Sequence, residues 1–484
     1  MPAIDFRLIS PEIFLVAWAF VVLFADLFVL RRQPQRGPVL AWMSALGLVI
    51  TGGLVFIAGF GSTFEGALQV DAFAFLFQLV CLGSGLLTVM LCSSLSDEIT
   101  AHRGEFYTLL LFSITGMMFL VASAELITFY VSLELVTIPL FVLVAYSKRD
   151  RRSIEAGIKY LIIGAFSSAI LLFGFALLYG LTGHTDFVEI KKALVITFFK
   201  YGQVGPVLAL ALLFVMAGLG FKLAVVPFHA WAPDVYEGSP TPVAAFLSVA
   251  SKAAGVAAFT RLFYRSFSMS AGDWLVPLMI LAVLAMVLGN TVALAQKNIK
   301  RLMAYSSIAQ VGYILVGFAA VSKLGAASVG LYLLMYLFAN MGAFGVAMAV
   351  YNKIGSFEIA DYAGLSRRSP QLAAILSLCL LSLVGIPPLA GFFGKYYLFL
   401  AAIEQRLYWL VLVALITSVV SLYYYAGIIK VMYFDTSKED APRFGVPAGA
   451  RVALWVTALG VVAMGIFPSL FLGWAEQAAS VFKF

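Results

Sequence analysis

Charged residues are scarce in this sequence. Only 11% of its 484 residues are Asp, Glu, Lys or Arg, whereas 63% are hydrophobic, and the mean hydropathy is +1.01. Soluble globular proteins are about 25% charged, so the scarcity excludes that class and predicts a polytopic membrane protein. The net charge of +7 does not indicate nucleic-acid binding, because the basic residues lie in short loops, where they set the orientation of the chain.

Cysteines and cofactor motifs are also rare. The three cysteines, Cys81, Cys92 and Cys379, lie in or at the ends of apolar runs and lack metal-ligand spacing, which predicts ordinary core or lipid-facing residues. The sequence contains no phosphate loop, no haem or iron–sulfur ligand spacing and no nucleophile triad. We therefore expect no cofactor-binding site, no metal site and no redox chemistry in this chain.

Long apolar runs dominate what is present. A run of about 20 apolar residues crosses a bilayer as a helix, and the sequence contains fourteen such runs. Their approximate limits are 10–30, 38–60, 71–93, 105–122, 124–146, 155–181, 206–231, 240–263, 274–296, 301–321, 326–351, 371–401, 407–432 and 449–473. The predicted fold is therefore an all-α bundle of about fourteen transmembrane helices.

Lysine and arginine are unevenly shared between the two sets of loops. Most of them lie on the side opposite the termini, as in the cluster Lys148-Arg149-Asp150-Arg151-Arg152. Cytoplasmic loops carry the excess of Lys and Arg. We therefore expect both termini on the non-cytoplasmic side of the membrane.

Two of the runs contain helix-breaking residues, at Pro227 and at Gly385-Ile386-Pro387-Pro388. Each break falls in the fourth helix of a five-helix unit, a pattern typical of inverted repeats in transporters. We expect the first three helices in 1–100, one five-helix unit in 104–265, a second, inverted unit in 274–433, and a last helix in 448–484. The alternative is that the prolines are ordinary features of membrane helices.

Ionisable residues at membrane depth are the candidates for chemistry. Each costs about 2.5 to 3.5 kcal/mol on insertion scales and marks a functional site or a buried partner. Glu134 and Lys222 lie near the middle of their runs, and we expect the Glu134 charge to set the proton affinity of Lys222. A static ion pair used for assembly is the alternative.

Two further lysines occupy similar depths. Lys252 lies among small residues that let helices approach closely, and no packing reason places an ammonium there. The Lys395 ammonium leans toward the break that precedes it, where the freed carbonyls of Leu383 and Val384 are potential acceptors. The alternative is that the Lys395 side chain extends to the membrane interface instead.

Other polar residues are more ambiguous. His229 follows Pro227 and suits a proton relay, although an interfacial histidine is an equal alternative. Further polar side chains at depth can bridge the two units with water or act as polar contacts between helices. These are Asn290, Tyr305, Ser306, Ser307, Gln310 and Asn340.

Three stretches, GLGFKLAVVPFHAWAPDVYEGSPTPVAAFLSVASKAAG, SLELVTIPLF and GIPPLAGFFGK, resemble the antiporter-like membrane subunits of bacterial respiratory complex I. The resemblance covers nearly the whole chain. It implies fourteen helices, two inverted units and a central hydrated axis on which Glu134, Lys222, Lys252 and Lys395 fill the family's positions. The lysine in the twelfth helix favours the subunit N group, the counterpart of mitochondrial subunit 2, over subunit M. The second unit has no acid that matches Glu134.

The resemblance also implies the function. We expect a proton-translocating subunit of NADH:quinone oxidoreductase in the bacterial inner membrane, with NADH, FMN, iron–sulfur clusters and quinone bound by other subunits. Its partners would be neighbouring antiporter-like and small membrane subunits. The rival interpretation is a subunit of a multi-subunit monovalent cation/proton antiporter, and a purely structural scaffold is a third.

Overall fold

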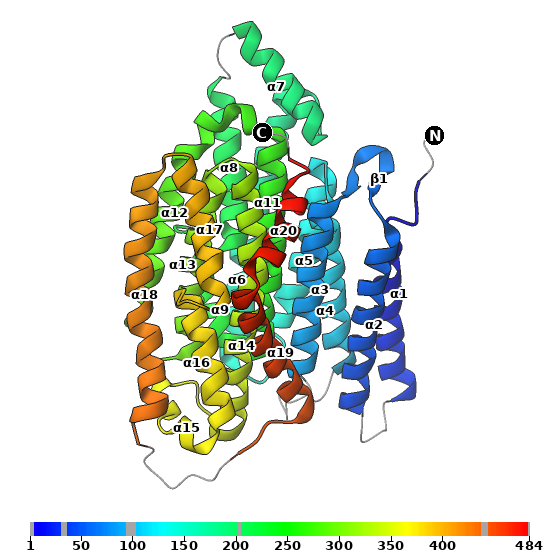
Figure 1. Cartoon of the computed structure of the whole chain (residues 1–484). Coiled ribbons are helices and arrows are strands. Elements are labelled where there is room, and N and C mark those ends of the chain that lie inside the picture. The colour runs from blue at the N-terminus through cyan, green and yellow to red at the C-terminus, as the bar shows by residue number, and fades with distance from the viewer. Residues whose placement is uncertain (1–3, 31–35, 93–102, 202–204, 437–443, 483–484) are drawn as a thin grey trace.

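A computed structural model describes residues 4–30, 36–92, 103–201, 205–436 and 444–482. The molecule is a bundle of long helices with both chain termini at the same end (Figure 1). Within the described residues, thirteen helices are long and apolar enough to cross a membrane, and a shorter apolar helix, Pro370–Val384, begins the expected twelfth span. The predicted fold class and the approximate span limits are therefore confirmed. The expected boundary at residue 100 and the last residue of the range 448–484 lie outside the described residues.

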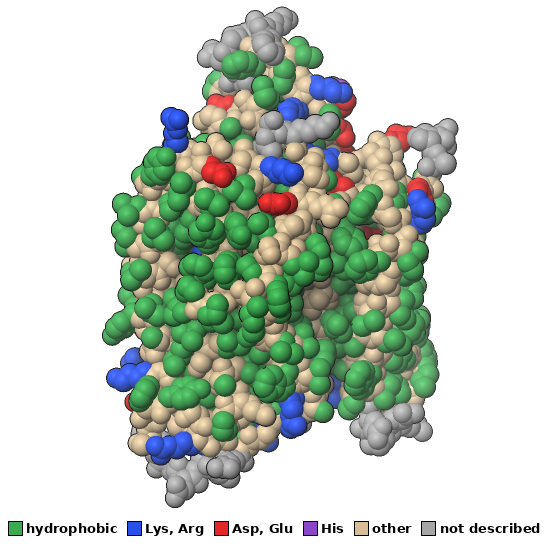
Figure 2. Space-filling model, in the orientation of Figure 1, with side chains coloured by type: hydrophobic (Ala, Val, Ile, Leu, Met, Phe, Trp, Pro, Cys, Tyr) green, Lys and Arg blue, Asp and Glu red, His purple; other side chains and the backbone are tan. Residues whose placement is uncertain are grey.

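The surface carries the pattern of a membrane protein. Hydrophobic side chains cover the middle of the visible face, and Lys, Arg, Asp and Glu gather at its two ends (Figure 2). Exposed apolar side chains such as Phe166, Val419 and Leu459 are 62 to 70% accessible, which is costly in water and favourable in lipid.

The first helices form one side of the bundle. They are α1 (Ser10–Phe24), continued by the π-helical turn η1 (Ala25–Val29), α2 (Arg36–Ala58) and α3 (Ala72–Cys92). A small antiparallel hairpin, β1 (Gly61–Thr63) and β2 (Leu68–Val70), joins α2 to α3 around the 3-10 turn η2 (Phe64–Gly66). The hairpin was not predicted, because its strands are too short to show an alternating pattern.

The next helices contain the first break. They are α4 (Arg103–Ala122), α5 (Leu126–Val144), α6 (Arg151–Thr182), α7 (Phe187–Tyr201), α8 (Pro206–Leu223), α9 (Trp231–Gly238), α10 (Thr241–Phe246), the π-helical turn η3 (Leu247–Ser251) and α11 (Lys252–Ser266). Helix α7 projects beyond the bundle at the end where the termini lie (Figure 1). It was not predicted, since it lies in a loop between spans. Every residue of the continuous segment α10–η3–α11 except Arg265 is buried, and the segment forms the centre of the molecule.

The second set of helices contains the second break. It comprises η4 (Ser268–Ser270), α12 (Ala271–Ala293), α13 (Ile299–Ala319), α14 (Lys323–Ile354), η5 (Ile359–Tyr362), α15 (Leu365–Arg368), α16 (Pro370–Val384), α17 (Ala390–Glu404) and α18 (Tyr408–Phe434). The chain ends with α19 (Ala448–Ile466) and α20 (Pro468–Ala479), which pack against α14 and α3.

The two breaks have the same local construction. Helix α8 ends at Leu223 and is capped by Ala224 in the left-handed conformation, with φ of +57°. Helix α16 ends at Val384 and is capped by Gly385, with φ of +96°. A left-handed cap satisfies the last helical carbonyls and turns the chain away from the helix axis. The predicted interruptions are therefore confirmed at both sites.

The cysteines are ordinary core residues. Cys81, Cys92 and Cys379 are all free thiols and all buried. No group of three or more His, Cys, Asp or Glu side chains that could hold a metal ion occurs in the described ranges.

A buried ion pair fixes the central helix at the end where the termini lie. Arg261 of α11 donates from both terminal nitrogens to Asp71, at 2.9 and 2.6 Å, and Arg265 donates to the same carboxylate at 3.2 Å. Burial opposes ionisation, but the two guanidinium groups outweigh it, so the pKa of Asp71 lies below its usual range. Asp71 joins the start of α3 to the end of α11, which holds the two helices in register.

We predict that Asp71→Asn destabilises the protein by about 3 to 5 kcal/mol, because it leaves the fully buried Arg261 charge without a counter-charge. The measurement is the thermal unfolding of the purified protein in detergent. Glu189→Gln is the matched control, because the Glu189–Lys192 pair is equally short at 2.7 Å but exposed, and exposed pairs contribute about 0 to 1 kcal/mol. Equal effects of the two changes would contradict the prediction.

Candidate functional site

Lys222 is a buried ammonium next to the first break. It lies in the last turn of α8, is only 3% exposed, and donates from Nζ to the Thr137 hydroxyl of α5 at 3.0 Å. This contact joins Lys222 to a neighbouring helix rather than to a carbonyl of its own break. The carbonyl of Phe221, beside the lysine, instead accepts a hydrogen bond from the Trp231 indole at 3.0 Å.

Glu134 lies one turn before Thr137 on α5 and is half-buried. Its carboxylate accepts a hydrogen bond from the Ser168 hydroxyl of α6. Within the described residues, Glu134 and Lys222 form no direct ion pair. The Thr137 hydroxyl that accepts from Lys222 donates to the Leu133 carbonyl at 2.7 Å. The expected partners thus lie in one cluster of packed helices, α5, α6 and α8, but each bonds a different hydroxyl.

Lys252 is held at the first residue of α11, directly after the π-helical turn η3. Its Nζ donates to the Ser307 hydroxyl at 2.6 Å and to the Ser307 carbonyl at 3.2 Å, and lies 5.9 Å from the centre of the Tyr236 ring. The lysine is 2% exposed. A π-helical turn shifts the side chains that come after it, so η3 helps to aim Lys252 at α13.

Lys395 uses the second break directly. Its Nζ donates to the freed Val384 carbonyl and to the Ser418 hydroxyl, both at 2.9 Å. The same nitrogen lies 4.4 Å from the centre of the Tyr313 ring, a cation–π distance. The predicted acceptance by Val384 is therefore confirmed. The Leu383 carbonyl is taken by the Gln310 side chain at 3.1 Å instead.

His229 lies inside the first break, between α8 and α9, and is half-buried. Its Nδ1 has no protein hydrogen-bond partner. The structure places it in the same break region as Lys222 but shows no hydrogen bond between the two side chains.

Polar side chains fill part of the space between Lys252 and Lys395. Ser306 and Ser307 bond to the hydroxyls of Tyr425 and Tyr336, and Gln310 accepts from Tyr332. The remaining contacts join Asn290 to Tyr313 and Tyr424, and Asn340 to Ser248. The sequence indicated most of the amide and serine members, but the tyrosines carry no signal that separates them from ordinary core residues.

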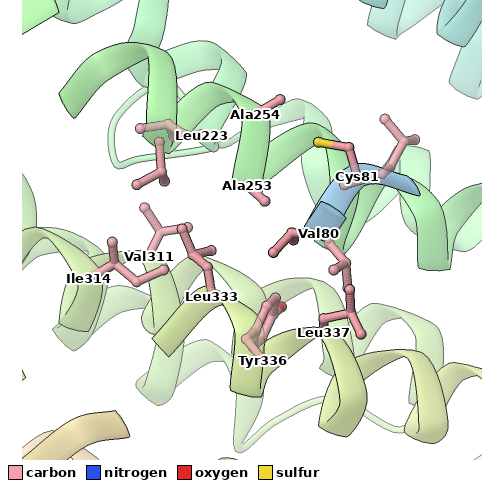
Figure 3. Packing of buried hydrophobic residues seen from close by; sticks show 14 of the residues in the cluster. Val80, Cys81, Leu223, Ala253, Ala254, Val311, Ile314, Leu333, Tyr336 and Leu337 are labelled. Carbon is pink, nitrogen blue, oxygen red and sulfur yellow. The ribbon is translucent and has the colours of Figure 1, made fainter. Parts of the chain in front are cut away.

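Buried apolar side chains pack around the helices that carry Lys222 and Lys252. Leu223 and Ala253, which adjoin the two lysines in sequence, face Val311 and Leu333 across the helices, and Tyr336 borders the same layer (Figure 3). The hydroxyl-rich contacts therefore gather around Lys252 and Lys395, whereas apolar side chains fill the layer beside Leu223 and Ala253.

The fold and site define a class: membrane bundles with two interrupted helices and single lysines buried beside them. The comparisons agree with it. Residues 123–421 match the family described as NADH:quinone oxidoreductase/Mrp antiporter, transmembrane. The chain is 42% identical to NADH-quinone oxidoreductase subunit N of Moorella thermoacetica, over 99% of each sequence.

Solved structures give the same result. A chain of respiratory complex I from Thermus thermophilus, with bound aureothin, is 34% identical with a TM-score of 0.79, over 96% of this chain and 98% of that one. A chain of the Mrp complex from Dietzia, 21% identical with a TM-score of 0.81 over 97% of each chain, shares the fold. The chain belongs to the family of antiporter-like membrane subunits, within its subunit N group. It is a multi-pass membrane protein whose relatives work in multi-subunit complexes.

Gly255 lets the first two lysines approach each other. It lies three residues after Lys252 on α11, and a Cβ placed there would be 3.0 Å from Leu223 Cδ2 and 3.3 Å from Lys222 Cγ. The Lys222 stem therefore packs directly on the backbone of the Lys252 helix.

We predict that Gly255→Ala moves the Lys222 stem by a few tenths of an ångström and lowers quinone reductase activity, and that Gly255→Val lowers it further. The measurement is NADH-driven quinone reduction by assembled complex in membranes. Gly427→Ala on α18 is the control, since a Cβ there meets nothing within 4 Å. Unchanged activity in the valine variant would show that the close approach is unnecessary.

Proposed function

We propose that this chain translocates protons across the membrane, coupled to NADH oxidation and quinone reduction in other subunits of the same complex. One observation carries the proposal. Lys222, Lys252 and Lys395 are at most 4% exposed, and in the described residues each is held by hydroxyl or carbonyl groups rather than by a carboxylate.

A buried ammonium with only neutral partners is poised to exchange its proton. Burying an isolated charge is expensive, and release of the proton removes the charge. A permanent structural role would be better served by an ion pair such as Asp71–Arg261, which the same protein also contains. The lysines therefore differ from the cations used for assembly.

Each candidate residue has its own role in proton transfer. Glu134 sets the proton affinity of Lys222 through its charge, Lys252 carries protons between the two units, and Lys395 is the terminal site beside the second break. His229 serves as a proton relay next to Lys222. The two units, 104–265 and 274–433, are inverted copies, flanked by the helices in 1–100 and by the helix in 448–484.

The chain works in the bacterial inner membrane, with both termini on the non-cytoplasmic side. NADH, FMN, iron–sulfur clusters and quinone belong to other subunits of the complex. Its immediate neighbours are other antiporter-like subunits and small membrane subunits. The family membership and the complex I relatives support this assignment.

A monovalent cation/proton antiporter subunit is the second candidate, because the Mrp chain shares the fold. Copurification separates the two. Isolation of the native complex with flavin and iron–sulfur subunits supports the first function, whereas isolation with antiporter subunits alone supports the second.

We predict that Glu134→Gln lowers proton pumping and quinone reduction together while the complex still assembles. Glutamine keeps the shape and accepts the Ser168 hydrogen bond, but it carries no charge to act on Lys222. The measurements are proton uptake and NADH oxidation in sealed membrane vesicles. Glu404→Gln, at the exposed end of α17, is the control. A normal rate and proton-to-electron ratio in the Glu134 variant would rule out the charge effect.

We predict that Lys252→Arg impairs turnover as strongly as Lys252→Met. Arginine keeps the positive charge but does not release a proton at accessible pH, so charge without titration is insufficient. Both variants are compared at equal content of assembled complex. Full activity of the arginine variant would assign Lys252 a fixed electrostatic role.

A further inference from the structure

Helix α9 continues the chain after the first break, and it is held from both sides by charged side chains. Asp234 Oδ2 accepts from Lys159 Nζ of α6 at 2.8 Å, and Asp234 Oδ1 accepts from Arg301 Nη1 of α13 at 2.8 Å. The two cations thus use different oxygens of one carboxylate. Helix α6 belongs to the first five-helix unit and α13 to the second, so a single side chain joins them.

The remaining contacts at this end strengthen the link to α13. Arg301 also donates to Glu237 at 2.9 Å. Lys300 is 2% exposed and donates to the carbonyls of Glu237 and Ser239 at 2.9 and 2.6 Å. Burial opposes ionisation of Asp234, but the hydrogen bonds from Lys159 and Arg301 outweigh it and hold the pKa of Asp234 below its usual range. The carboxylate is therefore ionised and accepts from both cations.

The other end of α9 reaches Lys222. Trp231, one turn before Asp234, donates its indole N–H to the Phe221 carbonyl, the residue adjacent to Lys222. The Trp231 ring also stacks on Tyr160 of α6, at 4.7 Å between ring centres, and Tyr160 follows Lys159 in sequence. Displacement of α9 would therefore act on the backbone that carries Lys222.

The register of the two breaks supports a functional position. Asp234 lies ten residues after the left-handed cap Ala224, and Lys395 lies ten residues after the left-handed cap Gly385. The second unit thus has its buried lysine at the position where the first unit has this bridging carboxylate.

We propose that Asp234 is a positioning residue: its carboxylate ties α9 to both five-helix units and so holds Lys222 in place relative to Glu134. We call the contacts of Asp234 with Lys159 and Arg301 the clamp. Its effect on pumping rests on the proposed function, but its existence is a separate structural claim. Contacts of this kind change coupling between sites by modest factors, so a partial loss is expected rather than complete inactivity.

The test uses assembled complex carrying Asp234→Asn. Asparagine has one acceptor oxygen, so it serves one cation and releases the other. We expect the rates of proton pumping and NADH oxidation to fall together by about two- to tenfold, and hydrogen exchange of the α9 amides to accelerate. Asp234→Glu keeps two acceptor oxygens and should restore both properties.

Glu155→Gln is the matched control. Glu155 bonds the same Lys159 nitrogen at 2.7 Å, but from the same helix and at the exposed surface, so it joins nothing to α9. An equal effect of Glu155→Gln, or unchanged hydrogen exchange in Asp234→Asn, would overturn the clamp. Faster exchange with a normal rate of proton pumping would overturn its link to Lys222. Failure of the proposed function itself would appear separately, as normal pumping in the Glu134 and Lys252 variants.

Discussion

The cost of placing positive charge at membrane depth governs the rest of this structure. An ammonium there must be surrounded by protein groups that replace water, and any broken backbone must also be satisfied within the protein. The two helix breaks meet both requirements at once. They free carbonyls inside the bundle, and they place polar backbone next to lysines that need acceptors.

The two breaks use their carbonyls differently. After α16, the freed Val384 carbonyl accepts directly from Lys395, which lies beyond the break. Before α9, the lysine lies ahead of the break, and the Phe221 carbonyl is bonded by the Trp231 indole. Lys222 turns to Thr137 on a neighbouring helix. The same backbone construction thus yields one lysine tied to its own break and one tied to the adjacent helix.

Much of the fold was predictable, because apolar run length and proline position act through local physics. The direction of the Cα–Cβ bond was enough to foresee the contact between Lys395 and Val384. The separate hydroxyl partners of Glu134 and Lys222 were not predictable, since they depend on how α5, α6 and α8 rotate against one another. The Asp71–Arg261 pair joins residues that are far apart in sequence, and nothing local to either residue indicates it.

The hydroxyl partners of the lysines also suit the neutral amine that remains after a proton is lost. A carboxylate is suited to an ammonium alone, and it would be left as a bare buried charge beside a neutral amine. A hydroxyl both donates and accepts. Thr137 and Ser418 accept from the ammonium while they donate to the carbonyls of Leu133 and Val384. After rotating, these hydroxyls and that of Ser307 can donate to the amine. The protein therefore offers both protonation states a hydrogen bond of similar geometry. Rotation of a hydroxyl, without a rearrangement of helices, is then enough to keep each lysine hydrogen-bonded after its proton is lost.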